Sequence, residues 1–176
     1  MTTIFNIINA CGTVATAVVA FFGFVLAIWQ YGKESIRKKR SETLAAYSAL
    51  FSEAFALRDE YIADFKEEDL FALKVLQSEE HTALCNKVLN LLTHFESFAK
   101  GLEYNIYDFR IFIYLTPQEM FEILNVLTQF VYEERKKKGY DLLFDDFIAL
   151  VSYTSLCMQN KLNHKKFSPK YKRVKV

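Results

Sequence analysis

The chain has 176 residues, 52% of them hydrophobic and 16% aromatic, and its net charge at neutral pH is +1. Once the apolar N-terminal run is subtracted, the rest is one domain of ordinary size with enough Phe and Tyr to bury a core, so we expect no second globular domain. The cysteines Cys11, Cys85 and Cys157 lie far apart and match no zinc-binding or CxxC spacing. The sequence therefore predicts no metal site, no disulfide framework and no cofactor.

The first 32 residues contain no charged side chain and no histidine. At about 1.5 Å rise per residue, a run of this length covers a hydrocarbon core roughly 30 Å thick, so we predict a single transmembrane helix over residues 1–31. Trp29 and Tyr31 lie where interfacial aromatic residues are expected. A cleaved signal peptide fits less well, because it needs an early positive charge and a shorter apolar core. An uncharged run of this length is also unusual for a buried helix of a soluble protein.

A basic run follows the predicted span directly. Its members are Lys33, Arg37, Lys38, Lys39 and Arg40. Cytoplasmic flanks of membrane spans are enriched in Lys and Arg, so this juxtamembrane basic run predicts a single-pass protein of a bacterial inner membrane. The N-terminus is expected outside and the remaining domain in the cytoplasm. Membrane lipid is therefore an expected partner.

One stripe of the predicted span carries only small or polar side chains. At heptad spacing it comprises Asn9, Thr13, Thr16, Ala20, Gly23 and Ala27. In lipid, helices associate through close approach over small residues and through hydrogen bonds between polar side chains. The stripe therefore predicts a homo-oligomer assembled through the membrane, which could line a pore. The alternative is that Ala and Thr are simply common in membrane spans.

After the span, apolar residues recur at helical spacing. Residues 32–64 are expected to form a basic juxtamembrane and amphipathic helix that continues straight from the span. Its acidic residues, expected on a solvated face, are Glu53, Asp59, Glu60 and Asp64. A shorter helix is predicted over residues 67–76. The next is expected to begin after a Ser78 cap and to end at Gly101.

The remaining helices are placed by start and stop signals. Residues 104–115 are compatible with a helix or a short strand, and we prefer helix because no partner strand is evident. Thr116 and Pro117 predict a helix start, whereas Gly139 after a run of cations predicts its end. A last helix is expected to open near Asp141.

These elements predict an all-α fold in which a single N-terminal transmembrane helix continues into a compact cytoplasmic helical bundle. The bundle is expected over residues 65–164. A basic tail over residues 165–176 completes the chain.

Several short motifs resemble an uncharacterised bacterial and phage family. They are residues 90–96 (NLLTHFE), 101–102 (GL), 107–108 (YD), 134–139 (ERKKKG) and 144–147 (FDDF). Thr43 also matches a threonine near the start of that family's juxtamembrane helix. The resemblance implies the same architecture and a mobile-element or phage-defence setting. The family carries no agreed activity, so no catalytic residue can be transferred.

Few residues in the sequence suggest catalysis, so we do not predict an enzyme. His81, His94 and His164 are widely spaced and match no metal-binding motif, and His94 is expected to be a satisfied interior or boundary residue. Adjacent carboxylates such as Asp145 and Asp146 point about 100° apart on a helix, which disfavours a paired acid/base role. Glu96 could meet Asp108 only if neighbouring helices brought them together.

Two polar segments near the C-terminus suggest other functions. Asn160 and His164 resemble the polar core of a helical ribonuclease motif, but Gln159 stands where that motif has an arginine. The basic tail carries Lys165, Lys166, Lys170, Lys172, Arg173 and Lys175. Three interpretations of this tail remain open: a disordered solubilising tail, contact with anionic lipid, or binding of an anionic nucleotide, with nucleic acid disfavoured.

The leading functional hypothesis is a membrane-anchored, oligomeric, non-enzymatic protein whose cytoplasmic domain senses a ligand or partner. A nucleotide second messenger in phage defence is one such ligand. The alternatives are a passive membrane scaffold or prophage exclusion protein, and a helical ribonuclease.

Overall fold

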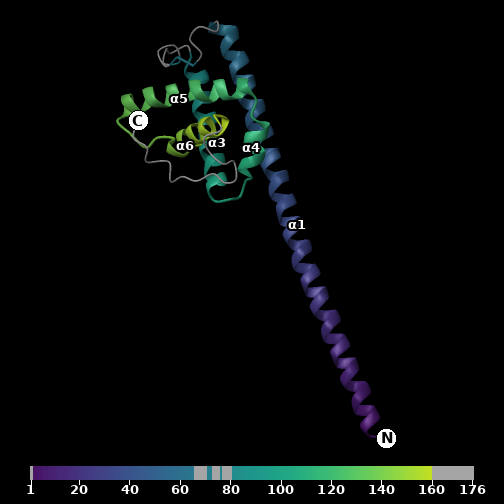
Figure 1. Ribbon diagram of the computed structural model, residues 1–176. Coiled ribbons are helices and arrows are strands. Elements are labelled where there is room, and N and C mark those ends of the chain that lie inside the picture. The colour runs from purple at the N-terminus through teal and green to yellow at the C-terminus, as the bar shows by residue number, and fades with distance from the viewer. Residues whose placement is uncertain (1, 66–70, 73–75, 77–80, 160–176) are drawn as a thin grey trace. The chain divides into compact units, whose positions relative to one another are not determined.

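The computed structural model describes residues 2–65, 71–72, 76 and 81–159, with the side chains of residues 16–63, 71–72, 76 and 81–159. Within these residues it contains helices and turns but no strand. The helices in Figure 1 are α1 (Thr2–Phe65), α3 (Thr82–Glu103), α4 (Phe109–Leu115), α5 (Gln118–Lys138) and α6 (Asp145–Met158). The predicted all-α class, with a long apolar N-terminal helix followed by a helical bundle, is confirmed.

Helix α1 runs without interruption through the expected span and the amphipathic segment that follows it. The chain nevertheless divides into two compact units, Met1–Lys39 and a second that begins at Arg40. The predicted 32–64 segment is therefore shared between the units. Its larger part belongs with the bundle.

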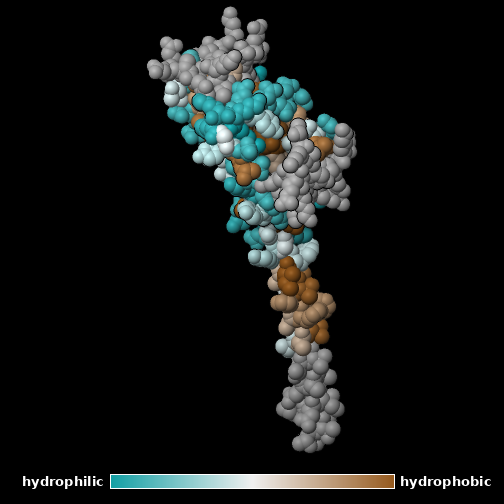
Figure 2. Space-filling view, turned by 90° about the vertical axis from the view of Figure 1, so that its left-hand side faces the viewer, coloured by the Kyte–Doolittle hydropathy of each residue, from teal (hydrophilic) through white to brown (hydrophobic). Residues whose placement is uncertain are grey.

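The first unit exposes its apolar side chains. From Val18 to Tyr31 the large apolar residues are between 45% and 78% exposed, and Figure 2 shows the brown surface that they form. By length and composition α1 could cross a membrane, and it is a candidate membrane span. The Lys33 ammonium lies 3.5 Å from the centre of the Trp29 ring, a cation–π contact at the end of the apolar run.

The core of the second unit is built on the amphipathic half of α1. The residues that α1 buries there recur at helical spacing: Tyr47, Leu50, Ala54, Leu57 and Tyr61. Ring contacts continue the core into the other helices, with Tyr47 5.9 Å from Phe112 of α4. Helix α6 packs against α3 and α5, and the rings of Phe95 and Phe147 lie 5.7 Å apart.

Glu53 and Glu60 keep 39% and 46% of their side-chain surface exposed, as expected of a solvated face, and both also contact α3. Glu53 accepts a 2.8 Å contact from His94 Nδ1, and Glu60 accepts hydrogen bonds of 2.5 and 2.8 Å from Lys87 Nζ. Both partners belong to α3, so these carboxylates form the polar edge of the α1–α3 contact. Asp59 is exposed, as expected. The side chain of Asp64 lies outside the described residues.

Of the helix predicted over residues 67–76, the structure describes only Phe71, Ala72 and Leu76; Leu76 is helical and its N–H donates 3.1 Å to the Ala72 carbonyl, whereas the other two are not helical. Phe71 lies in a turn with φ of 57°, and Ala72 is not helical, because the Phe71 ring has to turn inward against Tyr61 at 5.1 Å. The predicted Ser78 cap lies outside the described residues. Helix α3 begins at Thr82, after an N-cap at His81 whose side chain makes no capping hydrogen bond.

Helix α3 passes through Gly101 instead of stopping there. The expected stop was wrong because this glycine serves close packing and does not adopt a left-handed conformation: a Cβ at Gly101 would overlap Cδ2 and Cε2 of Tyr107. The chain turns afterwards at Asn105, with φ of 62°. The N–H groups of Ile106 and Tyr107 donate back to the Gly101 carbonyl.

The boundaries of α4 and α5 also shift. Within residues 104–115 only Phe109–Leu115 is helical, so the preference for helix over strand is confirmed for that part. Thr116 does not cap α5, because its hydroxyl donates 2.7 Å to the Phe112 carbonyl, and α5 starts at Gln118. The predicted stop is confirmed: Gly139 has φ of 67° and its N–H donates to the Arg135 carbonyl.

Helix α6 begins at Asp145, four residues after the expected opening near Asp141. The delay arises because the intervening residues form a turn, closed by the N–H of Leu143 donating to the Tyr140 carbonyl. Phe144 then adopts φ of 55°. The start of α6 is fixed by a carboxylate from another helix, described below.

We expect Gly101→Ala to destabilise the protein by about 1–3 kcal/mol, because the Tyr107 ring stacked on Phe98 would have to move. Thermal unfolding of the detergent-solubilised full chain measures this. Gly32→Ala is the matched control, since a Cβ there meets nothing within 4 Å. Equal melting temperatures for the two variants would contradict the close-packing role.

Candidate functional site

The predicted assembly stripe is open on the described part of α1. Ala20, Gly23 and Ala27 are exposed, and a Cβ at Gly23 would meet nothing within 4 Å. Thr16 is exposed as well. The side chains of Asn9 and Thr13 lie outside the described residues. Within the described part of the chain, no packing accounts for the small residues at positions 20, 23 and 27.

The juxtamembrane basic run is divided by the boundary between the two units. Lys33, Arg37 and Lys38 are exposed and belong to the first unit. Arg40 opens the second unit, and its Nε lies 3.8 Å from Oδ2 of Asp108. One member of the run is thus part of a site in the bundle. The basic tail 165–176, with Asn160 and His164, lies outside the described residues.

That site is a groove between α1 and α4, and two hydrogen bonds build it. At the start of α4, the N–H of Asp108 donates 2.7 Å to the Thr43 hydroxyl. At its end, the Tyr47 hydroxyl donates 2.9 Å to the Leu115 carbonyl. Thr43 and Tyr47 are one helical turn apart and both buried. The short helix is therefore fixed to α1 at both ends.

Burial raises the pKa of the Tyr47 hydroxyl, and a hydrogen bond with Thr116 partly counters this effect. The phenol consequently stays protonated at neutral pH and remains able to donate to the Leu115 carbonyl. A buried neutral hydrogen bond is costly to lose, because the remaining partner has no water molecule with which to form a new hydrogen bond.

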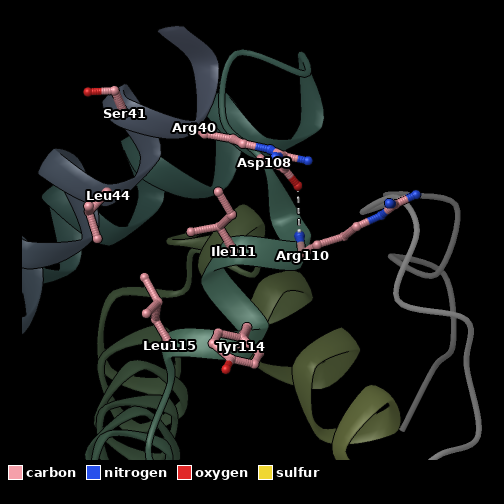
Figure 3. A pocket seen from close by; sticks show the side chains of 8 residues that line it. All are labelled: Arg40, Ser41, Leu44, Asp108, Arg110, Ile111, Tyr114 and Leu115. Carbon is pink, nitrogen blue, oxygen red and sulfur yellow. Dashed lines mark hydrogen bonds and ion pairs between the residues drawn. The ribbon is translucent and has the colours of Figure 1, made fainter. Parts of the chain in front are cut away.

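The groove has a volume of about 570 Å³, within the range of small-molecule sites. Its lining, shown in Figure 3, comprises Arg40, Ser41, Leu44, Asp108, Arg110, Ile111, Tyr114 and Leu115. Leu44 and Tyr114 are 52% and 89% exposed. The lining thus joins an apolar wall with charged and hydroxyl groups.

The charges of the groove do not cancel. Its single carboxylate, Asp108, lies beside the Arg40 guanidinium and accepts 3.1 Å from the backbone N–H of Arg110, the dashed line in Figure 3. The Arg110 side chain extends away from Asp108 (Figure 3) and makes no ion pair within the described part of the chain. Two guanidiniums against one carboxylate leave one positive charge. The groove therefore favours an anion.

Sequence reasoning did not find this groove. The family resemblance marked Thr43 and residues 107–108 without giving a physical reason. A usable signal was present: Thr43 interrupts the apolar stripe of α1, and a polar residue on a buried face needs a partner on another element. Nothing in the sequence identified that partner as a backbone N–H.

A second polar cluster joins α3 and α6. Glu96 meets Asp146, not Asp108, and accepts hydrogen bonds of 3.3 and 2.6 Å from the N–H groups of Asp146 and Phe147. Glu96 therefore caps the N-terminus of α6 from α3. Lys100 Nζ lies 3.9 and 3.7 Å from Glu96 and Asp146. This cluster is explained by its structural role.

The adjacent carboxylates of α6 diverge, as the sequence predicted. Asp146 is directed to Lys100, whereas Asp145 lies 3.7 Å from Arg135 of α5. The Arg135 Nε also donates 2.8 Å to the Leu143 carbonyl, which stabilises the turn between α5 and α6.

His94 lies at the bundle boundary beside Glu53, with its side chain 58% exposed. Among residues 16–63 and 81–159, no three metal-binding side chains gather.

Burial raises the pKa of Glu96, while the N–H groups of Phe147 and Asp146 lower it and the Asp146 carboxylate raises it further. The folded pKa is higher than the unfolded value, so the contribution of Glu96 to stability is present below about pH 4 and lost as pH rises through the folded pKa.

We therefore expect the stability advantage of the native chain over Glu96→Gln to be larger in acid than at neutral pH. Chemical unfolding in detergent across this pH range measures the difference. Glu133→Gln, on the exposed face of α5, is the control and should show no such trend. A difference that grows with pH would contradict the argument.

We expect Thr43→Val to loosen α4, because the isosteric change leaves the Asp108 N–H without its acceptor, at a cost of about 1–3 kcal/mol. Hydrogen exchange of the α4 amides should accelerate. Thr93→Val is the matched control, since the exposed Thr93 hydroxyl only donates to the Leu89 carbonyl in its own helix. Unchanged exchange in Thr43→Val would show that this hydrogen bond does not hold α4.

One protein family matches this chain over most of its length. No curated protein and no solved structure matches the chain. A family model, the domain of unknown function DUF4760, matches residues 17–153, which cover the apolar half of α1 from residue 17 and most of the bundle. Since this match spans more than half of the sequence, the chain belongs to the DUF4760 family.

Proposed function

We propose that the protein is a membrane-anchored, homo-oligomeric binding protein without enzymatic activity, and that its helical domain senses a ligand on the cytoplasmic side. The observation that carries the proposal is that a single helix, α1, supplies both the exposed apolar run and the central stripe of the bundle core. The apolar run and the core stripe therefore belong to one helix.

The exposed apolar run supports membrane insertion. A water-soluble protein rarely leaves contiguous apolar side chains uncovered, and here they extend around the helix from Val18 to Ile28. Lys33 and Arg37 follow at its end, which favours an N-terminus outside and a cytoplasmic bundle. The inner membrane of a bacterium is the location that these features suit.

The small-residue stripe supports self-association. Gly23 has open space around its missing Cβ, so none of the described residues requires its small size. Small residues on two copies of the helix would allow their backbones to approach closely.

A nucleotide second messenger, a phage-defence setting and a passive scaffold role stay predictions.

We expect Gly23→Leu to leave membrane insertion intact but to disperse the oligomer, because a leucine would hold the helix backbones apart. Cross-linking in native membranes and sizing in mild detergent measure this. Gly32→Leu is the matched control: it makes the same change at an equally open glycine outside the stripe. Two variants of unchanged size, or equal dispersal of both, would contradict assembly through the stripe.

A further inference from the structure

We propose that the α1–α4 groove binds one anionic phospholipid of the membrane leaflet on the bundle side. In this arrangement Arg40 and Arg110 hold the phosphate, and an acyl chain covers Leu44 and its apolar neighbours in the groove. The inference rests on the proposed membrane anchor and adds a specific lipid site within the bundle, distinct from the predicted basic tail.

The two guanidiniums supply the phosphate chemistry. Guanidinium groups bind phosphate through paired, charge-assisted hydrogen bonds. Arg110 makes no ion pair among the described residues, and Arg40 lies 3.8 Å from Asp108, beyond hydrogen-bonding distance, with its side chain 60% exposed. Both groups can therefore turn to an incoming anion, and the Ser41 hydroxyl on the same lining can donate to it.

The apolar wall favours a lipid over a soluble anion. Leu44, Ile111 and Leu115 line the groove beside the guanidiniums, and Leu44 is 52% exposed. A free phosphate would occupy the charged end and leave this wall in water. An acyl chain would cover it and gain about 25 cal/mol for each Å² removed from water. Tyr114, 89% exposed, is of a type enriched where membrane meets water.

Only a short segment of chain separates the predicted span from the groove. Arg40 follows Gly32, the end of the uncharged run, by only eight residues, which span at most about 29 Å even when fully extended. The proposal places the groove, which begins at Arg40, beside the lipid headgroups once the span is inserted, and this short segment permits that placement. The other basic residues of the intervening segment would concentrate anionic lipid there.

Lipid in the groove would act on α4. The groove contains residues of α1 and α4, so an occupant that contacts both adds to the hydrogen bonds of Thr43 and Tyr47. Binding should consequently slow the opening of α4, which gives the proposal a local readout.

The experiment uses the full-length protein in phosphatidylcholine nanodiscs, with and without phosphatidylglycerol. Hydrogen exchange reports on the amides of Phe109–Leu115, and native mass spectrometry identifies retained lipid. Phosphatidylglycerol should be retained and should protect α4. Arg110→Gln should weaken its apparent affinity about fivefold, and Leu44→Gln should also weaken it. Both positions are exposed, so neither substitution disturbs the core.

Lys136→Gln is the matched control, because it removes one exposed cation from α5, outside the groove. Equal weakening by this variant would overturn the site in favour of diffuse charge attraction. Protection of α4 by soluble glycerol phosphate, as strong as by the lipid, would overturn the lipid assignment. Absence of phosphatidylglycerol protection in a normally inserted protein would overturn the groove alone, whereas failure to enter nanodiscs would contradict the membrane anchor itself.

Discussion

Helix α1 has to satisfy two different surroundings along one uninterrupted backbone. From Val18 to Tyr31 its large apolar side chains are exposed, whereas from Thr43 to Tyr61 one face is buried against α3 and α4. Exposed apolar surface is costly in water, but a buried amphipathic face is the normal way to build a bundle. The same helix thus carries a candidate membrane span in one part and the central stripe of a protein core in the other.

The fixation of α4 follows from this constraint. Its seven residues are too few to be stable alone, so α4 depends on packing and on the hydrogen bonds to Thr43 and Tyr47. These bonds leave a groove with surplus positive charge. A binding surface is therefore built from an element held by a few identifiable contacts, and such elements respond readily to a ligand.

The sequence was sufficient for the architecture because its signals are local. The uncharged run, the helical spacing of Tyr47 to Tyr61 and the Gly139 stop each act within a few residues of one another. Errors arose where a distant residue decides the outcome. Gly101 is required by Tyr107 packing, and α6 starts where Glu96 reaches its first amides. The groove escaped prediction for the same reason, since the acceptor Thr43 and its donor are 65 residues apart.

The central claim is that α1 crosses a membrane and leaves the bundle in the cytoplasm. Alkaline extraction of membranes from cells that produce the full chain, combined with protease treatment of intact spheroplasts, tests it most directly. The account predicts that the protein stays in the membrane pellet and that its bundle is cleaved only after the spheroplasts are broken. Release into the alkaline supernatant, or cleavage of the bundle in intact spheroplasts, would contradict it.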